Sequence, residues 1–157
     1  MAVSPLLCRR LLVVCAVLLF AVALAVAVGV IPPVRAATIP GATPGRAVPA
    51  FWVSVGLHLV VALTLVFTAM RSKGRSWIST SGLVVMGLAV LLFGIALTDA
   101  FFAYHSEGSS MRTVSVLLFF CVAADSLAGV LTITTAFLRP KRTREGLTSG
   151  SSRPHNP

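Results

Sequence analysis

The chain has 157 residues, of which 57% are hydrophobic and only 11% are charged. Soluble domains are roughly 45–50% apolar and roughly 25% charged, so the sequence excludes an ordinary soluble globule, and its apolar runs leave no room for a soluble catalytic domain. The net charge of +9 comes from basic residues grouped between the apolar runs, which indicates membrane topology and anionic lipids and argues against nucleic acid as a partner.

The first apolar run covers residues 11–31 and follows a short basic N-terminus, residues 1–10. A helix of this length rises about 31 Å, which is enough to span a bilayer. A cleaved signal peptide is the competing interpretation. The basic start, the apolar core and the small residue Ala36 before Ala37 fit a cleavage site. The core is, however, longer than the usual 7–15 residues or so.

The segment after this run is rich in proline. Pro32-Pro33 predicts the end of the first helix, and five prolines within residues 32–49 predict an external loop without regular structure. A second span is expected over residues 50–70. A basic cytoplasmic turn, residues 71–76, then leads to a third span over residues 77–104.

The third span contains Gly82, Gly87 and Gly94. These glycines do not form a nucleotide-binding loop, because they lie within an apolar run and no Lys-Ser/Thr pair follows them. Small residues in an apolar helix let a neighbouring helix approach closely. We therefore expect these positions to be sites of close helix packing.

A short external loop, residues 105–112, precedes the fourth span at residues 113–138, and a basic, disordered cytoplasmic tail is expected over residues 139–157. Four spans place ten of the 13 Lys and Arg residues on one side and three on the other. The positive-inside rule then puts both termini in the cytoplasm. The predicted fold class is an all-α membrane protein with four transmembrane helices in a small antiparallel bundle.

Asp125 is the one formal charge within the fourth span and lies close to its middle. A carboxylate at the centre of a bilayer costs roughly 2.5–3.5 kcal/mol, so it requires a partner, a watery cavity or a bound proton. The residues that share its helical face are nearly all small. They are Cys121, Ala128, Gly129 and Thr132. This pattern predicts a face packed on other helices and turned away from lipid.

His58 is the basic residue that the sequence offers as a partner for Asp125, because no Lys or Arg lies inside a predicted span. Asp99 lies further toward the outer end of the third span, near the interface, where contact with the headgroups is the alternative to joining this pair. The depths of His58, Asp99 and Asp125 lead to the hypothesis that these side chains cluster in the outer half of the bundle. Three roles for Asp125 stay open: helix packing, docking of a basic residue from a partner's helix, and a proton or ion path.

Two further candidate sites lie at the ends of the apolar runs. Cys8 stands beside a basic pair at the expected membrane boundary, where S-acylation occurs. A basic group after the fourth span is expected to contact anionic lipid. It consists of Arg139, Lys141, Arg142 and Arg144. The spacing of the three cysteines predicts neither a metal site nor a disulfide, and no cofactor is expected.

These features predict a small tetraspan, multi-pass membrane protein that is not an enzyme. The expected role is that of an accessory, scaffolding or trafficking factor acting through helix contacts in the bilayer. Its expected partners are lipids and either another membrane protein or further copies of itself. The alternative is a small transporter or channel subunit that uses Asp125 with His58 or Asp99 as a proton or ion site. The sequence does not distinguish the plasma membrane from internal membranes.

Overall fold

A computed structural model of the chain describes residues 5–36, 44–71, 79–105 and 112–138. All regular structure in these ranges is helical. The elements are α1 (Pro5–Ala25), the π-helix η1 (Val26–Val30), α2 (Ile31–Ala36), α3 (Pro44–Met70), α4 (Thr80–His105) and α5 (Arg112–Leu138). Because α1, η1 and α2 follow one another without a break, they form one long helical rod.

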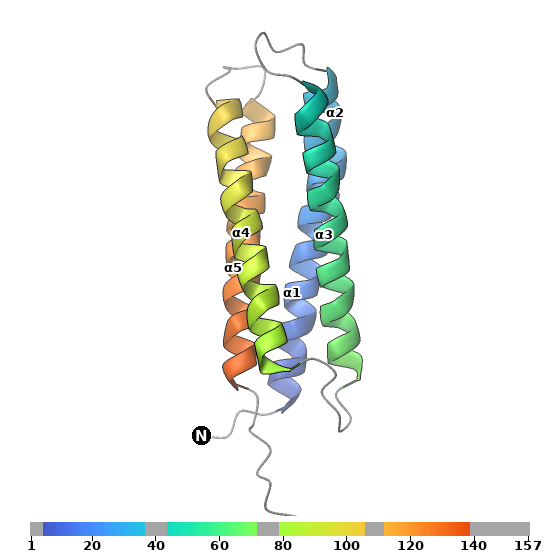
Figure 1. Ribbon diagram of the computed structural model, residues 1–157, viewed down its shortest axis with the longest axis vertical. Helices are drawn as coiled ribbons and strands as arrows, with labels where there is room; N and C mark the ends of the chain where they lie inside the picture. The colour runs from blue at the N-terminus through green and yellow to red at the C-terminus, as the bar shows by residue number, and fades with distance from the viewer. Residues whose placement is uncertain (1–4, 37–43, 72–78, 106–111, 139–157) are drawn as a thin grey trace, which may run out of the picture.

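Four stretches of these helices are long and apolar enough to cross a membrane, which confirms the expectation of an all-helical protein with four such segments. They lie side by side along the long axis of the molecule (Figure 1). They are Leu6–Ala36, Val48–Met70, Thr80–Phe102 and Arg112–Leu138. The beginning of α1 and the end of α5 lie at the same end of the molecule (Figure 1).

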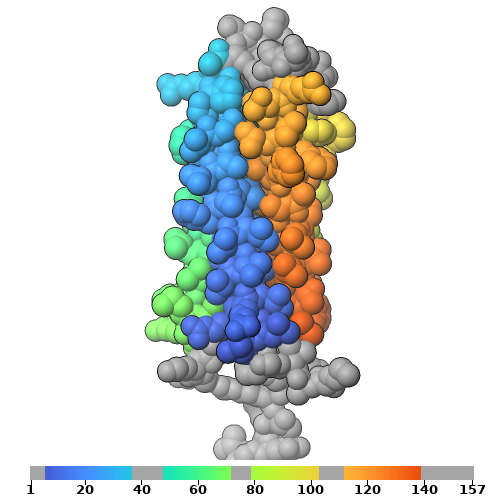
Figure 2. All heavy atoms as spheres, turned by 180° about the vertical axis from the view of Figure 1, so that it is seen from behind, coloured from blue at the N-terminus to red at the C-terminus, as the bar shows by residue number. Residues whose placement is uncertain are grey.

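The helices do not contact one another equally. The rod formed by α1, η1 and α2 packs against both α3 and α5, and α4 packs mainly against α5. The face in Figure 2 shows this rod between α3 and α5. The helices α3 and α4 approach each other at few positions. The molecule therefore consists of an α1–α3 side and an α4–α5 side, joined chiefly through α1 and α5.

Close contact between α4 and α5 depends on two glycines. A Cβ atom added at Gly87 would lie 2.9 Å from the carbonyl oxygen of Gly129, and one added at Gly129 would lie 3.0 Å from that of Gly87. The same position at Gly87 is 2.5 Å from Cγ1 of Ile133. These distances leave no room for a side chain, so the two backbones touch. The predicted role of Gly87 in close packing is confirmed.

The first helix differs from its predicted form, because it continues through Pro32-Pro33 to Ala36. The sequence prediction that these prolines end the helix is wrong. A proline normally breaks a helix because it lacks an N–H and its ring crowds the preceding turn. Here η1 loosens that turn: the N–H of Ile31 donates to the carbonyl of Val26, five residues earlier.

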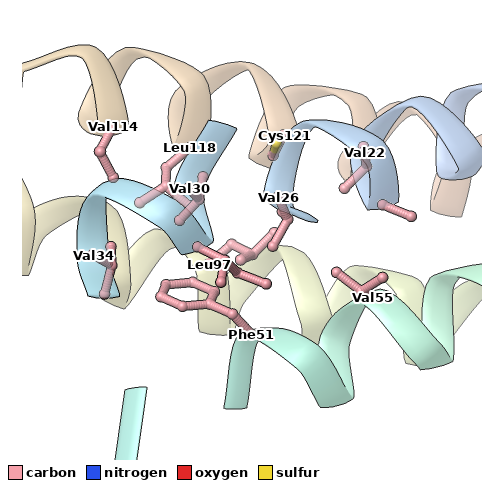
Figure 3. Packing of buried hydrophobic residues seen from close by; sticks show 12 residues of the cluster. Val22, Val26, Val30, Val34, Phe51, Val55, Leu97, Val114, Leu118 and Cys121 are labelled. Carbon is pink, nitrogen blue, oxygen red and sulfur yellow. The ribbon is translucent and has the colours of Figure 1, made fainter. Parts of the chain in front are cut away.

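The π-helix also keeps one row of valines on the core side. Val22, Val26, Val30 and Val34 are all buried and point into the same cluster (Figure 3). A spacing of four exceeds the 3.6 residues of an α-helical turn, so such a row drifts around a regular helix. A π-turn takes more residues, so η1 reverses part of that drift. Burial of Val30 and Val34 thus offsets the disruption at the prolines.

Other boundaries also differ from those expected. The second helix begins at Pro44, so residues 44–49 belong to α3 and not to a loop, and Pro5 rather than residue 11 begins α1. His105, expected in the external loop, is the last residue of α4. The fourth helix, expected over residues 113–138, covers Arg112–Leu138. Most of the expected basic turn and the whole expected tail lie outside the described residues.

A buried histidine–aspartate pair as the candidate functional site

The buried apolar side chains form two separate clusters along the bundle. The upper cluster lies toward the α2 end of the bundle and contains Val22, Ala23, Val26, Val30, Ile31, Val34, Phe51, Val55, Leu97, Val114, Leu118 and Cys121. The lower cluster contains Leu12, Cys15, Ala16, Leu19, Ala62, Leu65, Ala69, Leu83, Val90, Ala128 and Ala136. Figure 3 shows the upper cluster. Each of the four helical segments contributes to both clusters.

His58 and Asp125 occupy the level between the two clusters. On α3, His58 lies between Val55 of the upper cluster and Ala62 of the lower one. On α5, Asp125 lies between Cys121 and Ala128 in the same way. His58 is 1% exposed and Asp125 is fully buried. The core is therefore interrupted by one polar layer near the middle of the helices.

The two side chains contact each other directly across the bundle. Nε2 of His58 lies 3.1 Å from Oδ1 and 3.1 Å from Oδ2 of Asp125. Both distances fall within the range of a nitrogen–oxygen hydrogen bond. This contact links α3 to α5, and so joins the α1–α3 side of the molecule to the α4–α5 side.

The backbone of α3 fixes the proton on the other ring nitrogen. Nδ1 of His58 lies 2.6 Å from the carbonyl oxygen of Ser54 and 3.3 Å from its hydroxyl. A carbonyl only accepts hydrogen bonds, so Nδ1 carries a proton and donates it. One further proton then lies between Nε2 and the carboxylate. Whether that proton resides on the imidazole or on Asp125, the pair has no net charge.

Neutrality explains how two ionisable groups remain in an apolar interior. An isolated buried carboxylate is costly, whereas a paired and hydrogen-bonded one is tolerated. Gly94 on α4 lies beside the aspartate: a Cβ atom added there would be in van der Waals contact with the Cβ of Asp125, at 3.4 Å. The ring of Phe93 lies against the imidazole, with a centroid separation of 5.5 Å. The pair is thus enclosed by α3, α4 and α5.

The small residues that share the face of Asp125 are buried as predicted. Cys121, Ala128, Gly129 and Thr132 are all buried on α5. On other sides of α5, Val130 and Phe137 are 53% and 73% exposed. The helical periodicity around Asp125 therefore predicted correctly which side of α5 is buried.

Asp99 does not join the pair. Its side chain is exposed on α4, and the described residues contain no group of three or more His, Cys, Asp or Glu side chains that could hold a metal ion. The expected cluster of His58, Asp99 and Asp125 therefore contains only two of its members in the structure. The sequence predicted that His58 and Asp125 lie at matching depths, but it did not predict that Asp99 lies on the outward side of α4.

The remaining candidate sites have different outcomes. Cys8 is 6% exposed, so attachment of an acyl chain requires its neighbours to move, and S-acylation there stays a prediction. The expected lipid-binding group lies outside the described residues. It consists of Arg139, Lys141, Arg142 and Arg144. Cys15 and Cys121 are buried and have free thiols.

Seven other hydroxyl groups within the helices are satisfied by their own backbone, whereas the buried hydroxyl of Ser115 has no hydrogen-bond partner among the described residues. Each of the seven donates to the carbonyl four residues earlier, at 2.6–2.8 Å. They belong to Thr64, Thr68, Thr98, Ser126, Thr132, Thr134 and Thr135. A hydroxyl bonded in this way needs no water. These side chains are thus suited to an apolar surrounding.

Comparison with known proteins gives no relatives: no family model, no curated protein and no solved structure matches the chain. The physical description of the helices and of the His58–Asp125 pair is therefore the basis for a functional proposal.

Proposed function

We propose that this chain is a multi-pass membrane protein that acts as a non-enzymatic accessory, scaffolding or trafficking factor, through contacts of its helices with another membrane protein. In this proposal the four helices form an antiparallel transmembrane bundle with both termini in the cytoplasm. The ten-to-three distribution of basic residues supports that orientation. The membrane in which the protein resides is left open.

One observation carries the proposal: each of the four helical segments exposes large apolar side chains on the outside of the bundle, while the buried acid Asp125 is satisfied from within. Large exposed side chains include Val17 at 63%, Leu63 at 68%, Leu92 at 66% and Phe120 at 63%. Each belongs to a different helix. Such a surface fits lipid tails or other helices. Asp125, by contrast, is fully buried against His58, so we assign it to packing within the chain and not to docking.

The assignment of Asp125 to packing follows from what a polar layer does in an apolar core. Apolar side chains of similar shape pack adequately in several helix registers, whereas a buried polar pair is satisfied in one register alone. His58 and Asp125 lie at equivalent levels on α3 and α5, between the two apolar clusters. We propose that the pair selects this arrangement of helices.

The experiment is purification from native membranes in mild detergent, followed by quantitative mass spectrometry and reconstitution into vesicles. The proposal expects a reproducible membrane-protein partner and no ion flux from the purified chain alone. An unrelated four-span protein with the same tag, expressed at the same level, is the control. Lack of any enriched partner under several mild conditions would contradict the proposed role.

A proton or ion carrier is the second candidate, and the shared proton of the His58–Asp125 pair is the observation that favours it. Ionisable pairs within apolar helices occur in proton relays. This candidate expects proton flux into vesicles that is abolished by Asp125→Asn, with the variant folding normally. Flux that is absent, or unchanged by that substitution, eliminates the carrier and leaves the accessory role.

A further inference from the structure

The outer face of α4 contains a carboxylate that forms no hydrogen bond or ion pair with the residues that the structure describes. Leu92, Ile95 and Phe102 are 66%, 61% and 63% exposed, and Asp99 is exposed among them. Residues three, four and seven positions apart share one side of a helix, so Asp99 lies near the centre of this apolar strip. The opposite side of α4 faces the core, where Val90 and Leu97 are buried.

We propose that this face of α4 binds a transmembrane helix of another protein, and that Asp99 pairs there with a lysine or arginine of that helix. The inference rests on the proposed function and names the surface through which it operates. The sequence alone left open that Asp125 is the docking charge. The inference assigns that role to Asp99, the acid that is exposed on the bundle.

The depth of Asp99 is the first argument. It lies six to seven residues from the middle of α4, Thr80–His105, which corresponds to about 10 Å along a helix axis. Half of a typical hydrocarbon core is about 15 Å, so a centred bundle places the carboxylate about 5 Å inside the apolar region. Lysine and arginine reach the headgroups from such depths on long stems. Aspartate has one methylene and does not.

The described residues supply no counter-charge at the level of Asp99. Within the described ranges, α4 contains no Lys or Arg, and Asp99 forms no hydrogen bond or ion pair. Arg112 is the nearest arginine in α5. Since Gly94 lies beside Asp125, Asp99 is level with about residue 120 of α5. Arg112 is then about eight residues, or about 12 Å, further along the axis.

Charge also selects among the occupants of this face. A second copy docked symmetrically through α4 brings one Asp99 toward the other, which is unfavourable because the charges are alike. The amines of lipids lie among the headgroups, beyond the apolar region in which Asp99 sits. A helix of another protein can carry a basic residue to the required depth, where both charges are desolvated and each needs the other.

The experiment is site-specific photo-crosslinking in native membranes. A photoreactive amino acid is placed at Ile95, one turn from Asp99, and in a matched control at Leu63 of α3, which is 68% exposed. We expect position 95 to capture a segment of another membrane protein that contains Lys or Arg within an apolar run. Asp99→Asn should lower the yield at least about tenfold, because truncating one member of a desolvated charge pair is costly, whereas Asp99→Glu should retain it.

Three results would overturn the inference: capture of lipid alone at position 95, capture of a second copy, or a yield that is unchanged in Asp99→Asn. Because Asp99 is exposed, neither substitution disturbs the core, and equal elution volumes verify that the variants fold. Comparing the two crosslinking positions distinguishes failure of this docking face from failure of the proposed function. Protein captured at position 63 but not at 95 removes this docking face alone, and no captured protein at either position removes both. A reversed pair, Asp99→Lys with an acid in place of the partner's basic residue, should restore the yield.

Discussion

Replacing both members of the buried pair should destabilise the protein less than replacing either one. The variants are His58→Leu, Asp125→Ala and the double substitution, in which the larger leucine offsets the smaller alanine. In His58→Leu the carboxyl of Asp125 loses its partner, and in Asp125→Ala the Nε2 atom of His58 does. The double variant leaves neither group unpaired, because apolar side chains replace the His58–Asp125 layer between the two clusters.

The structure sets the size of the effect. Both side chains are at most 1% exposed, so water does not replace the lost contact, and the two 3.1 Å contacts disappear together. A buried polar group without a partner costs about 1–3 kcal/mol. Each single variant is therefore expected to lose about 2 kcal/mol. Since the double variant is expected to lose less than either single one, the sum of the two losses should exceed its loss by at least about 2 kcal/mol.

The assay is reversible unfolding in mixed micelles of mild and denaturing detergent, monitored by helical circular dichroism. Asp125→Asn is the matched control. Its amide donates to Nε2, and the Nδ1–H of His58 still donates to the carbonyl of Ser54, so its free energy of unfolding should lie close to that of wild type. Strictly additive losses would refute the reasoning, because they would mean that His58 and Asp125 contribute independently.

Three further predictions follow from the fold. Gly87→Ala should cost about 1–3 kcal/mol, because its Cβ overlaps Ile133 and the backbone of Gly129, whereas Gly56→Ala, with nothing within 4 Å, should be neutral or slightly stabilising; equal melting temperatures for the two would contradict the account of the α4–α5 contact. The intact mass of the mature protein should include residues 1–36, since α1 supplies buried residues to both clusters and α2 to the upper one; a mature N-terminus at Ala37 would show that signal cleavage occurs. Epitope tags at both termini should be digested by protease only after the cell membrane is opened, and digestion of either tag in intact cells would disprove the proposed orientation.

Much of the helical framework was predictable from the sequence. Apolar runs between basic groups give four spans, and α5 was expected to within one residue at its start. The small residues around Asp125 predicted which side of α5 is buried, because a charge in an apolar helix leaves a recognisable pattern on its own face. His58 was the basic residue at a matching depth, and the structure puts it in contact with Asp125.

The sequence did not predict which side of α4 faces outward, or that the first helix continues through Pro32-Pro33. Both sides of α4 are apolar, so hydrophobic periodicity carries little information about which side Asp99 occupies. The helix through Pro32-Pro33 depends on η1 and on the burial of Val30 and Val34 against other helices. A rule based on proline alone considers only neighbouring residues in the chain, so it misses this long-range compensation.

The position of the pair in the sequence also bears on how the chain is made. His58 precedes Asp125 by 67 residues, an interval of about 3–13 s at ordinary rates of synthesis, about 5–20 residues per second. The imidazole, which can enter an apolar environment in its neutral form, is therefore produced first. The acid is produced last, within the final helix. When α5 leaves the ribosome, the imidazole of His58 has already been synthesised, so Asp125 can pair with it as soon as α5 joins the bundle.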